Sequence, residues 1–325
     1  MDSIPTISAV CEQYLRTIQF ARSENTYKTY RNGLNLFLKM LAEKKIDIST
    51  MNISFLSDEQ FAAFIAYLKY QSPATERLYL TSVKAFYEYI TSEKLAEINL
   101  VRIQLLIKQR SRKAGVRLPQ FPKSEIDVVL EKADQLSNLH TDGEVERLIN
   151  YRDRAFLFCL ADTGLRVHEA CKLRRGDINW FELRAIVIGK GNREAVVRFS
   201  ERSIQKIKEY INLRAELDGA TGISLSALPI FARHDKGAGK KITPITTTTG
   251  RNIVTARVVE FLGQSAAGTI TPHSFRHYFV TRILQASGNL KLAQSLARHT
   301  NIAVTQRYAH INDDELDRGY KDIFK

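Results

Sequence analysis

Apolar residues recur every three or four positions in the first 105 residues, and this spacing strongly constrains the fold. In the segment from residue 24 to residue 41, the apolar face of the predicted helix consists of Tyr27, Tyr30, Leu34, Phe37, Leu38 and Leu41. Charged and amide side chains share the opposite face. Because an amphipathic helix must bury its apolar face against other elements, the spacing predicts a helical bundle.

Serine residues mark the starts of the predicted helices. Ser23 can cap a helix that begins near residue 24, and Ser57 precedes another that runs to about residue 69. Proline suits the first helical position, so Ser72-Pro73 predicts a further helix. The apolar stripe of that helix is Leu80, Val83, Tyr87 and Ile90. The polar faces could contact DNA or simply face solvent, and their basic residues include Lys28, Arg31, Arg77 and Lys84.

A basic stretch follows these helices. Residues 108–123 contain six basic residues and no acidic residue, and Gly115, Pro119 and Pro122 discourage regular structure. We therefore expect a helical domain over residues 1–107, a basic linker over residues 108–117 and a second domain over residues 118–325. The linker could follow a DNA duplex or serve as a solvated hinge, and its candidate DNA contacts are Arg110, Arg112 and Lys113.

The pattern changes after residue 124. Helical spacing is found at residues 124–137, 146–161, 168–174, 200–217, 250–263, 274–287 and 289–298. Two short runs of β-forming residues, Ala185–Ile188 and Ala195–Phe199, flank a glycine-containing segment and predict a hairpin. Residues 218–248 are rich in Gly and Thr, and we expect a loop there. The predicted fold class is mainly α with a small β-sheet, in two domains.

The net charge of +13 favours a polyanionic partner. No apolar run approaches the ~20 residues of a membrane span, and the N-terminus shows no secretory signal. The three cysteines form neither a metal-ligand pattern nor a disulfide framework. We expect a cytoplasmic protein that binds no membrane and uses no metal or other cofactor.

An ordered set of arginine, histidine, lysine and tyrosine residues lies in the second domain. Phosphodiester transfer concentrates negative charge on the nonbridging oxygens, which suits the planar, always charged guanidinium of Arg. A His can hydrogen-bond a phosphoryl oxygen, a Lys can protonate the leaving oxygen, and a Tyr hydroxyl can attack. The set therefore predicts phosphoryl transfer on nucleic acid. Its candidate residues are Arg166, Lys190, His273, Arg276, His299 and Tyr308.

Each of these residues also has a structural interpretation. Arg166 could simply pair with Glu169, and Lys190 could be a solvated turn residue. Two further tyrosines, Tyr278 and Tyr320, are rivals for the attacking role. The order and spacing of the whole set are harder to explain structurally than any single residue.

Three segments carry a family resemblance: residues 163–169 (Thr-Gly-Leu-Arg-Val-His-Glu), 187–193 (Val-Ile-Gly-Lys-Gly-Asn-Arg) and 273–277 (His-Ser-Phe-Arg-His). Together with His299, and with Tyr308 nine residues later, they resemble the tyrosine recombinase (phage integrase) family, and most closely its Xer-like members. The resemblance covers nearly the whole chain. It implies that Arg166, Lys190, His273, Arg276 and His299 activate a DNA phosphate and that Tyr308 attacks it. It also implies that Glu169 supports these groups.

The resemblance further implies a helical, SAM-like core-binding domain and a catalytic domain that form a C-shaped clamp on double-stranded DNA. The implied reaction is site-specific recombination through a 3′-phosphotyrosyl intermediate and a Holliday junction, by a homotetramer on two paired sites of the nucleoid. Both an Xer-like recombinase and a mobile-element integrase fit. The alternatives are a type IB topoisomerase and a DNA-binding regulator with an inactive site. The sequence leaves open whether an accessory protein activates the enzyme.

The chain also departs from the family pattern. The family usually has Leu-Gly-His where this chain has Ala297-Arg298-His299, which leaves the geometry around His299 open. The chain begins directly with core-binding helices, which favours a simple recombinase over integrases that need accessory DNA sites. The resemblance implies that the tail after Tyr308 packs on a neighbouring protomer, and packing on its own domain fits equally well. The apolar residues of the tail are Leu316, Tyr320, Ile323 and Phe324.

Overall fold

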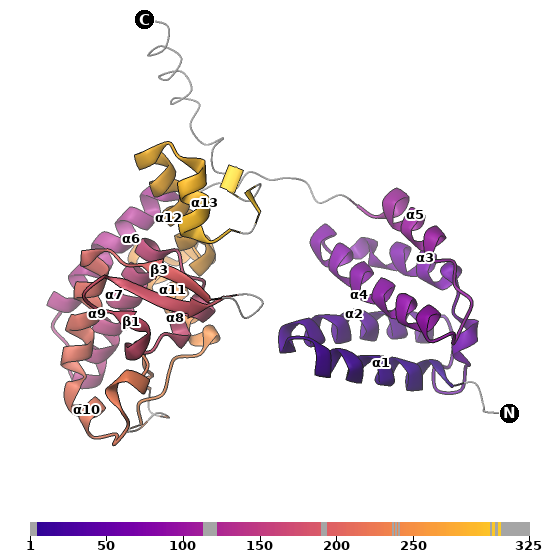
Figure 1. Ribbon diagram of the computed structural model, residues 1–325, viewed down its shortest axis with the longest axis horizontal. Helices are drawn as coiled ribbons and strands as arrows, with labels where there is room; N and C mark the ends of the chain where they lie inside the picture. Colours follow the sequence, from indigo (N-terminus) through magenta and orange to yellow (C-terminus); the bar gives the residue numbers. More distant parts are fainter. Residues whose placement is uncertain are drawn as a thin grey trace, which may run out of the picture. The chain divides into compact units, whose positions relative to one another are not determined.

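The computed structural model describes residues 5–112, 122–189, 194–235, 237, 239, 241–299, 301–302 and 305–306. The chain divides into two compact units, Met1–Arg117 and Leu118–Lys325. Figure 1 shows the described part of the first unit as helices and that of the second as helices with a small sheet. The fold is therefore mainly α with a small β-sheet, as the sequence predicts.

The described part of the N-terminal unit contains α1 (Ile7–Ala21), α2 (Glu24–Glu43), α3 (Asp58–Tyr67), α4 (Pro73–Ser92) and α5 (Leu100–Arg110). Side-chain caps start three of these helices where the sequence predicts. Ser23 Oγ accepts the main-chain N–H of Thr26 at 3.3 Å, and Ser72 caps α4 in the same way. Ser57 and Gln60 form a reciprocal capping box at the start of α3.

The predicted apolar stripes form the core of this unit. Their fully buried members are Leu34, Phe37, Leu41, Leu80, Val83, Tyr87 and Ile90. The rings of Phe37 and Tyr87 pack edge to face with their centroids 5.9 Å apart. Gly33 permits α2 and α4 to approach closely, because a Cβ at this position would lie 2.0 Å from Ser82 Oγ. On the opposite face of α2, Lys28 and Arg31 are exposed.

Helix α5 corrects the sequence interpretation of residues 108–110. We expected a linker to begin at residue 108, but α5 continues to Arg110. Asn99 caps the helix by accepting the N–H of Arg102 at 2.9 Å, and Ile103 and Leu106 bury its apolar face. The basic residues at positions 108 and 110 end the apolar pattern before the helix itself ends, so the sequence did not indicate the last turn.

The described part of the C-terminal unit contains eight α-helices. They are α6 (Lys123–Gln135), α7 (Glu144–Thr163), α8 (Val167–Lys172), α9 (Glu201–Leu213), α10 (Ala215–Gly219), α11 (Thr247–Leu262), α12 (Pro272–Ser287) and α13 (Leu290–Ala297). Helix α7 is central, since it contacts α6, α8, α9 and α12. The helices lie where the sequence predicts, although the segment 200–217 forms two helices. No described helix combines the length and apolar character needed to cross a membrane.

A small antiparallel sheet lies beside these helices. Its strands β1 (Ile178–Asn179), β2 (Arg184–Ile188) and β3 (Glu194–Arg198) pair in the order β1-β2-β3. The predicted hairpin is β2–β3, with Ile186 opposite Val196, whereas the two-residue strand β1 was not predicted. The segment that joins β2 to β3 includes Lys190, which lies outside the described residues.

The described part of the segment 218–248 is mostly loop, as predicted, but part of it is packed into the core. Leu228, Ile230 and Phe231 are buried in it. The fully buried guanidinium of Arg214 donates to the main-chain oxygens of Pro229 at 2.8 Å and Ile230 at 3.1 Å. The sequence concealed this because a short apolar run without helical or alternating spacing predicts no element.

Candidate active site

Arg276 connects three segments of the C-terminal unit. Thr271 and Ser274 cap α12 reciprocally and Pro272 occupies its first turn, so the helix begins just before His273 and carries Arg276 inward one turn later. Arg276 is only 3% exposed. Its guanidinium donates to the carbonyl oxygens of Gly164, at the end of α7, and of Ala297, at the end of α13. This arginine therefore fixes the two helix ends that carry the other candidate residues.

Arg166 and Glu169 form the pair that the sequence suggested. Gly164 ends α7 in a left-handed conformation with φ 60°, and Arg166 then begins the short helix α8. Glu169 Oε2 accepts the main-chain N–H of Arg166 at 2.9 Å, and Oε1 accepts Nη1 at 3.0 Å. The carboxylate is buried, whereas 38% of the Arg166 side chain is exposed. Glu169 thus orients a guanidinium whose other donors have no partner among the described residues and can bind a phosphate.

Three histidines lie close to these arginines. The rings of His273 and His277 are perpendicular, with centroids 4.2 Å apart. Burial and the charges of Arg276 and Arg166 lower the pKa of His273, and the same causes lower the pKa of His299 to about 4. Burial, together with the neighbouring His273 and His299, lowers the pKa of His277 to about 4. All three imidazoles are therefore neutral at pH 7 and can each donate one N–H.

His299 is positioned by the end of α13. Arg298 adopts a left-handed conformation with φ 57° and ψ 42°, which ends the helix and turns the chain. The His299 N–H then donates to Gln294 O at 3.1 Å, and its ring Nδ1 lies 2.9 Å from Thr305 Oγ1. The family's usual glycine is therefore not needed for the turn, because Arg298 adopts the conformation itself.

The structure brings together five of the predicted residues, namely Arg166, Glu169, His273, Arg276 and His299. Tyr308, Lys190 and Lys113 lie outside the described residues. Tyr278, one rival for the attacking role, donates its hydroxyl to Asp127 Oδ1 at 2.6 Å. Burial and this carboxylate raise the pKa of Tyr278 to about 12, which makes it a poor nucleophile.

Sequence reasoning missed Arg298 as a member of this cluster. Its Nη2 donates to Glu169 Oε2 at 2.9 Å, so Glu169 joins Arg166 to Arg298. His277 was also left without a role, although it belongs to the quoted 273–277 motif. The available signal for Arg298 was the replacement of the family's glycine immediately before His299.

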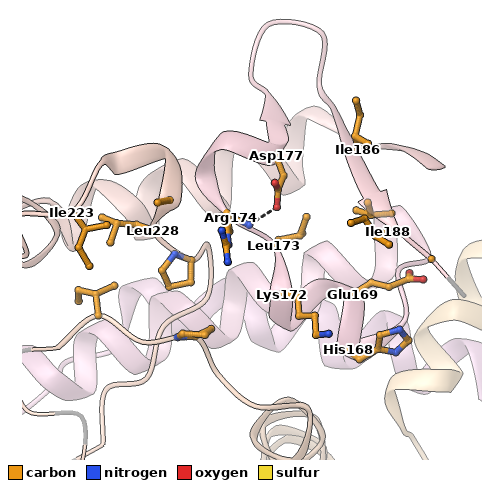
Figure 2. A pocket seen from close by; sticks show the side chains of 16 residues that line it. His168, Glu169, Lys172, Leu173, Arg174, Asp177, Ile186, Ile188, Ile223 and Leu228 are labelled. Atoms are coloured by element: carbon orange, nitrogen blue, oxygen red, sulfur yellow. Dashed lines mark hydrogen bonds between the residues drawn. The ribbon is translucent and has the colours of Figure 1, made fainter. Parts of the chain in front are cut away.

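A cavity of about 910 Å³ opens on one side of Glu169. Figure 2 shows His168 and Glu169 projecting from α8 at one end of it, with Ile188 of β2 beside them. Most of the remaining wall is apolar, with Ile223 and Leu228 at the far end. Arg166, His273, Arg276 and His299 do not line it. Glu169 is therefore the one candidate residue in the wall of this cavity among those that the structure describes.

The predicted DNA-contact residues of the N-terminal unit are distributed differently. Arg77 and Lys84 line a groove of about 690 Å³ on α4 and α5, together with Lys108 and Arg112. Lys28 and Arg31 lie on the exposed face of α2, where Lys28 pairs with Glu24 at 3.3 Å. Arg110 is exposed at the end of α5. The groove therefore collects only part of the predicted set, and it adds Lys108.

The chain matches two family models. Residues 130–315 match the Phage integrase family, and residues 11–94 match the Phage integrase N-terminal SAM-like domain. The tyrosine recombinase XerD of Staphylococcus saprophyticus is 25% identical over 322 residues, which cover 98% of this chain and 99% of the relative. The tyrosine recombinase XerC of Treponema denticola is 28% identical over 331 residues, covering 97% and 98%.

Solved structures share the fold. The XerH site-specific recombinase bound to its palindromic difH substrate aligns with a TM-score of 0.67 and 19% identity, over 98% of this chain and 84% of that chain. The Tn1549 transposon integrase in complex with transposon right end DNA aligns with a TM-score of 0.63 and 19% identity, over 97% and 99%.

The first family model alone covers more than half of the chain. The relatives match along nearly their whole length. This chain therefore belongs to the phage integrase family and is an Xer-like tyrosine recombinase, an enzyme of site-specific DNA recombination.

Proposed function

We propose that the enzyme exchanges strands of double-stranded DNA through a covalent bond to Tyr308. The Tyr308 hydroxyl would lose its proton as its oxygen bonds to phosphorus and displaces the 5′ oxygen. The 5′ oxygen would take up a proton, and a 3′-phosphotyrosyl bond would remain. The 5′ hydroxyl of another strand would then attack the same phosphorus and release the tyrosine. One phosphoester bond is exchanged for another, so the reaction needs no ATP.

The observation that carries this proposal is the meeting of Arg166, His273, Arg276 and His299. A phosphate among them would find two fixed positive charges on the guanidiniums. It would also find two neutral imidazole donors, because the pKa values of His273 and His299 are lowered. The Glu169 carboxylate, which would otherwise repel a phosphate, is already paired with two arginines.

One further role, that of Lys190, rests on the motif alone. Lys190 would protonate the leaving 5′ oxygen from the segment between β2 and β3. A DNA substrate with a 5′-thiolate leaving group needs no proton at that atom. It should therefore restore part of the cleavage lost in Lys190→Ala, and a failure to do so would remove Lys190 as the general acid.

The N-terminal unit would hold the DNA duplex. Arg77, Lys84 and Lys108 line one groove, where Lys84 pairs with Glu88, and the net positive charge of the groove suits the phosphate backbone. Lys28, Arg31, Arg110 and Lys113 would extend this contact. The solved complexes of XerH with difH and of the Tn1549 integrase with transposon DNA support a duplex partner, as does the net charge of +13.

Strand exchange between two sites would require several protomers. We propose a homotetramer on two paired sites that forms and resolves a Holliday junction. The tail after Tyr308 carries apolar residues at helical spacing and would pack on a neighbouring protomer. Placement of the nucleophile by a neighbour would couple cleavage to assembly.

A trapped covalent adduct tests the chemistry. A binding site selected from a random-sequence duplex pool is given a nick, so that cleavage releases a short fragment and the adduct accumulates. Wild type and Tyr278→Phe should form an adduct that survives detergent, whereas Tyr308→Phe should bind the DNA normally and form none. An adduct in Tyr308→Phe would show that another group attacks.

A two-site assay separates the alternatives. The recombinase should exchange strands between two duplexes that carry the selected site. A topoisomerase would relax supercoiled DNA without a second site, and a regulator with an inactive site would form no adduct.

A further inference from the structure

Arg298 occupies a backbone position that a glycine would fill at lower cost. Its φ of 57° lies in the left-handed region, where the side chain of an L-residue is crowded. Helices often end with glycine in this conformation. The turn that leads to His299 therefore explains the conformation but not the presence of an arginine.

Among the described residues, the side chain of Arg298 also carries a hydrogen-bond donor without a partner. Only 11% of the side chain is exposed, and its buried Nε has no partner among the described residues. Leaving a buried donor unpaired destabilises a folded protein. An arginine that adds both a crowded backbone and an unpaired Nε is poorly explained by stability, and such costs cluster at functional sites.

The contact that Arg298 gains is the one with Glu169. Glu169 Oε1 accepts Nη1 of Arg166, while Oε2 accepts both the main-chain N–H of Arg166 and Nη2 of Arg298. The ion pair thereby joins the turn that carries Arg166 to the turn that precedes His299. Arg276 spans the same two turns through the carbonyl oxygens of Gly164 and Ala297.

The charge balance of this group also depends on Arg298. One carboxylate between two guanidiniums leaves a net charge of +1, whereas Glu169 and Arg166 alone would be neutral. Because Arg298 shares the carboxylate, Glu169 neutralises less of the charge of Arg166. More of that charge is then available to a phosphate.

We propose that Arg298 is a positioning residue of the active site: its ion pair with Glu169 holds the His299 turn against the Arg166 turn and keeps Arg166 available to the phosphate. The inference rests on the proposed function, since it assigns Arg166 and His299 to the phosphate. It adds a residue to the site that takes the place of the family's usual glycine.

The test is Arg298→Gly, which keeps the left-handed turn and removes only the side chain. The substrate is the nicked duplex with the selected site, at saturating protein. DNA affinity should stay within about twofold, while single-turnover cleavage should fall roughly 10- to 100-fold, as expected for displaced catalytic groups. Arg298→Lys should recover part of the rate, because its ammonium can still pair with Glu169.

Lys291→Ala is the matched control. Lys291 is exposed on α13, and its side chain donates to Gln294 Oε1 at 3.4 Å. The variant removes one positive charge from the same helix without touching Glu169, and its cleavage rate should equal that of wild type. If Lys291→Ala and Arg298→Gly lose the same amount of cleavage rate, the loss is explained by net charge alone and the proposal is wrong.

A double-mutant cycle separates positioning from a general structural role. Glu169→Gln combined with Arg298→Gly should cleave no more slowly than the slower single variant, because both remove the same link. If the fold-losses in cleavage rate of the two single variants multiply in the double variant, Arg298 acts independently of Glu169. If Arg298→Gly does not fold, Arg298→Gln is tested instead, because glutamine has a similar shape and no charge. Cleavage by Arg298→Gln at the wild-type rate would overturn the proposal.

The outcome distinguishes this inference from the proposed function. If wild type forms the adduct and Arg298→Gly cleaves at the same rate, the inference alone is wrong. If wild type forms no adduct on the selected site, the proposed function fails, and with it the role of Arg298.

Discussion

Glu76 and Arg112 are joined by two hydrogen bonds at the C-terminal end of the N-terminal unit. The fully buried carboxylate accepts the Arg112 main-chain N–H at 2.9 Å and its Nε at 2.6 Å. Nη2 of the same guanidinium donates to the carbonyl oxygens of Leu68 and Gln71. Arg112 is thus anchored to α4 and to the turn before it. Arg112 is therefore packed against the N-terminal unit and does not lie in a solvated linker, and its predicted contact with DNA stays a prediction.

Arg112→Ala should therefore destabilise the N-terminal unit. It leaves the buried Glu76 with the main-chain N–H of residue 112 and with Lys69 at 3.3 Å, and the loss of the side-chain hydrogen bond to this charged group costs about 1.5–3 kcal/mol of unfolding free energy. Far-UV circular dichroism should show helix loss at lower urea. Trp180, the only tryptophan, lies in the C-terminal unit, so the unfolding transition followed by its fluorescence should not shift. Equal unfolding curves for Arg112→Ala and the control Arg110→Ala would contradict the assignment.

Arg166→Ala and Arg276→Ala should lower the cleavage rate to a similar extent, but they should differ in how much they destabilise the protein. Each should lower cleavage by about 10²–10³, the usual loss for one fixed donor to a developing negative charge. Arg276→Ala should also destabilise the C-terminal unit, because it leaves the buried oxygens of Gly164 and Ala297 without this donor. Arg166→Ala should destabilise it less, since Glu169 keeps Arg298. The two variants are compared by Trp180 fluorescence in urea, and equal stability would disprove the bridging role of Arg276.

Neutralising the groove of the N-terminal unit should weaken the salt dependence of DNA binding. If Arg77 and Lys84 each contact a phosphate, the double alanine variant should lower the slope of log affinity against log salt by about 2. Fluorescence anisotropy with the selected duplex measures the slope. Arg16→Ala is the control, because Arg16 lies on α1, outside the residues that line the groove. An unchanged slope in the double variant would place the duplex elsewhere.

The C-terminal unit should lose stability as pH falls from about 6.5 to about 4. Burial and neighbouring charges lower the pKa of His277 and of His299 to about 4, whereas an unfolded histidine titrates near pH ~6.5. The unfolded chain therefore binds protons first within this window, which favours unfolding, and neither histidine contributes above it. Urea unfolding followed by Trp180 fluorescence should show the decline. His299→Gln should reduce it, whereas replacement of the exposed His140 by Gln should not.

Much of the fold could be read from the sequence because helix formation is local. Capping residues and apolar spacing act within a few positions of each other, so Ser23, Ser57 and Ser72 mark helix starts correctly. The elements that escaped prediction lack such local signals. Strand β1 has two residues, and the buried run at Leu228–Ala232 has no regular spacing.

The candidate site divides in the same way. The sequence by itself determined which residues are candidates for the chemistry, because the order of Arg166, His273, Arg276, His299 and Tyr308 is a motif along the chain. Only the tertiary structure decided how they are held. The ion pair of Arg298 with Glu169 joins residues 129 positions apart, and the hydrogen bond of Arg276 to Gly164 spans 112. No local pattern encodes such contacts, because they form only when packing around α7 brings the helix ends together.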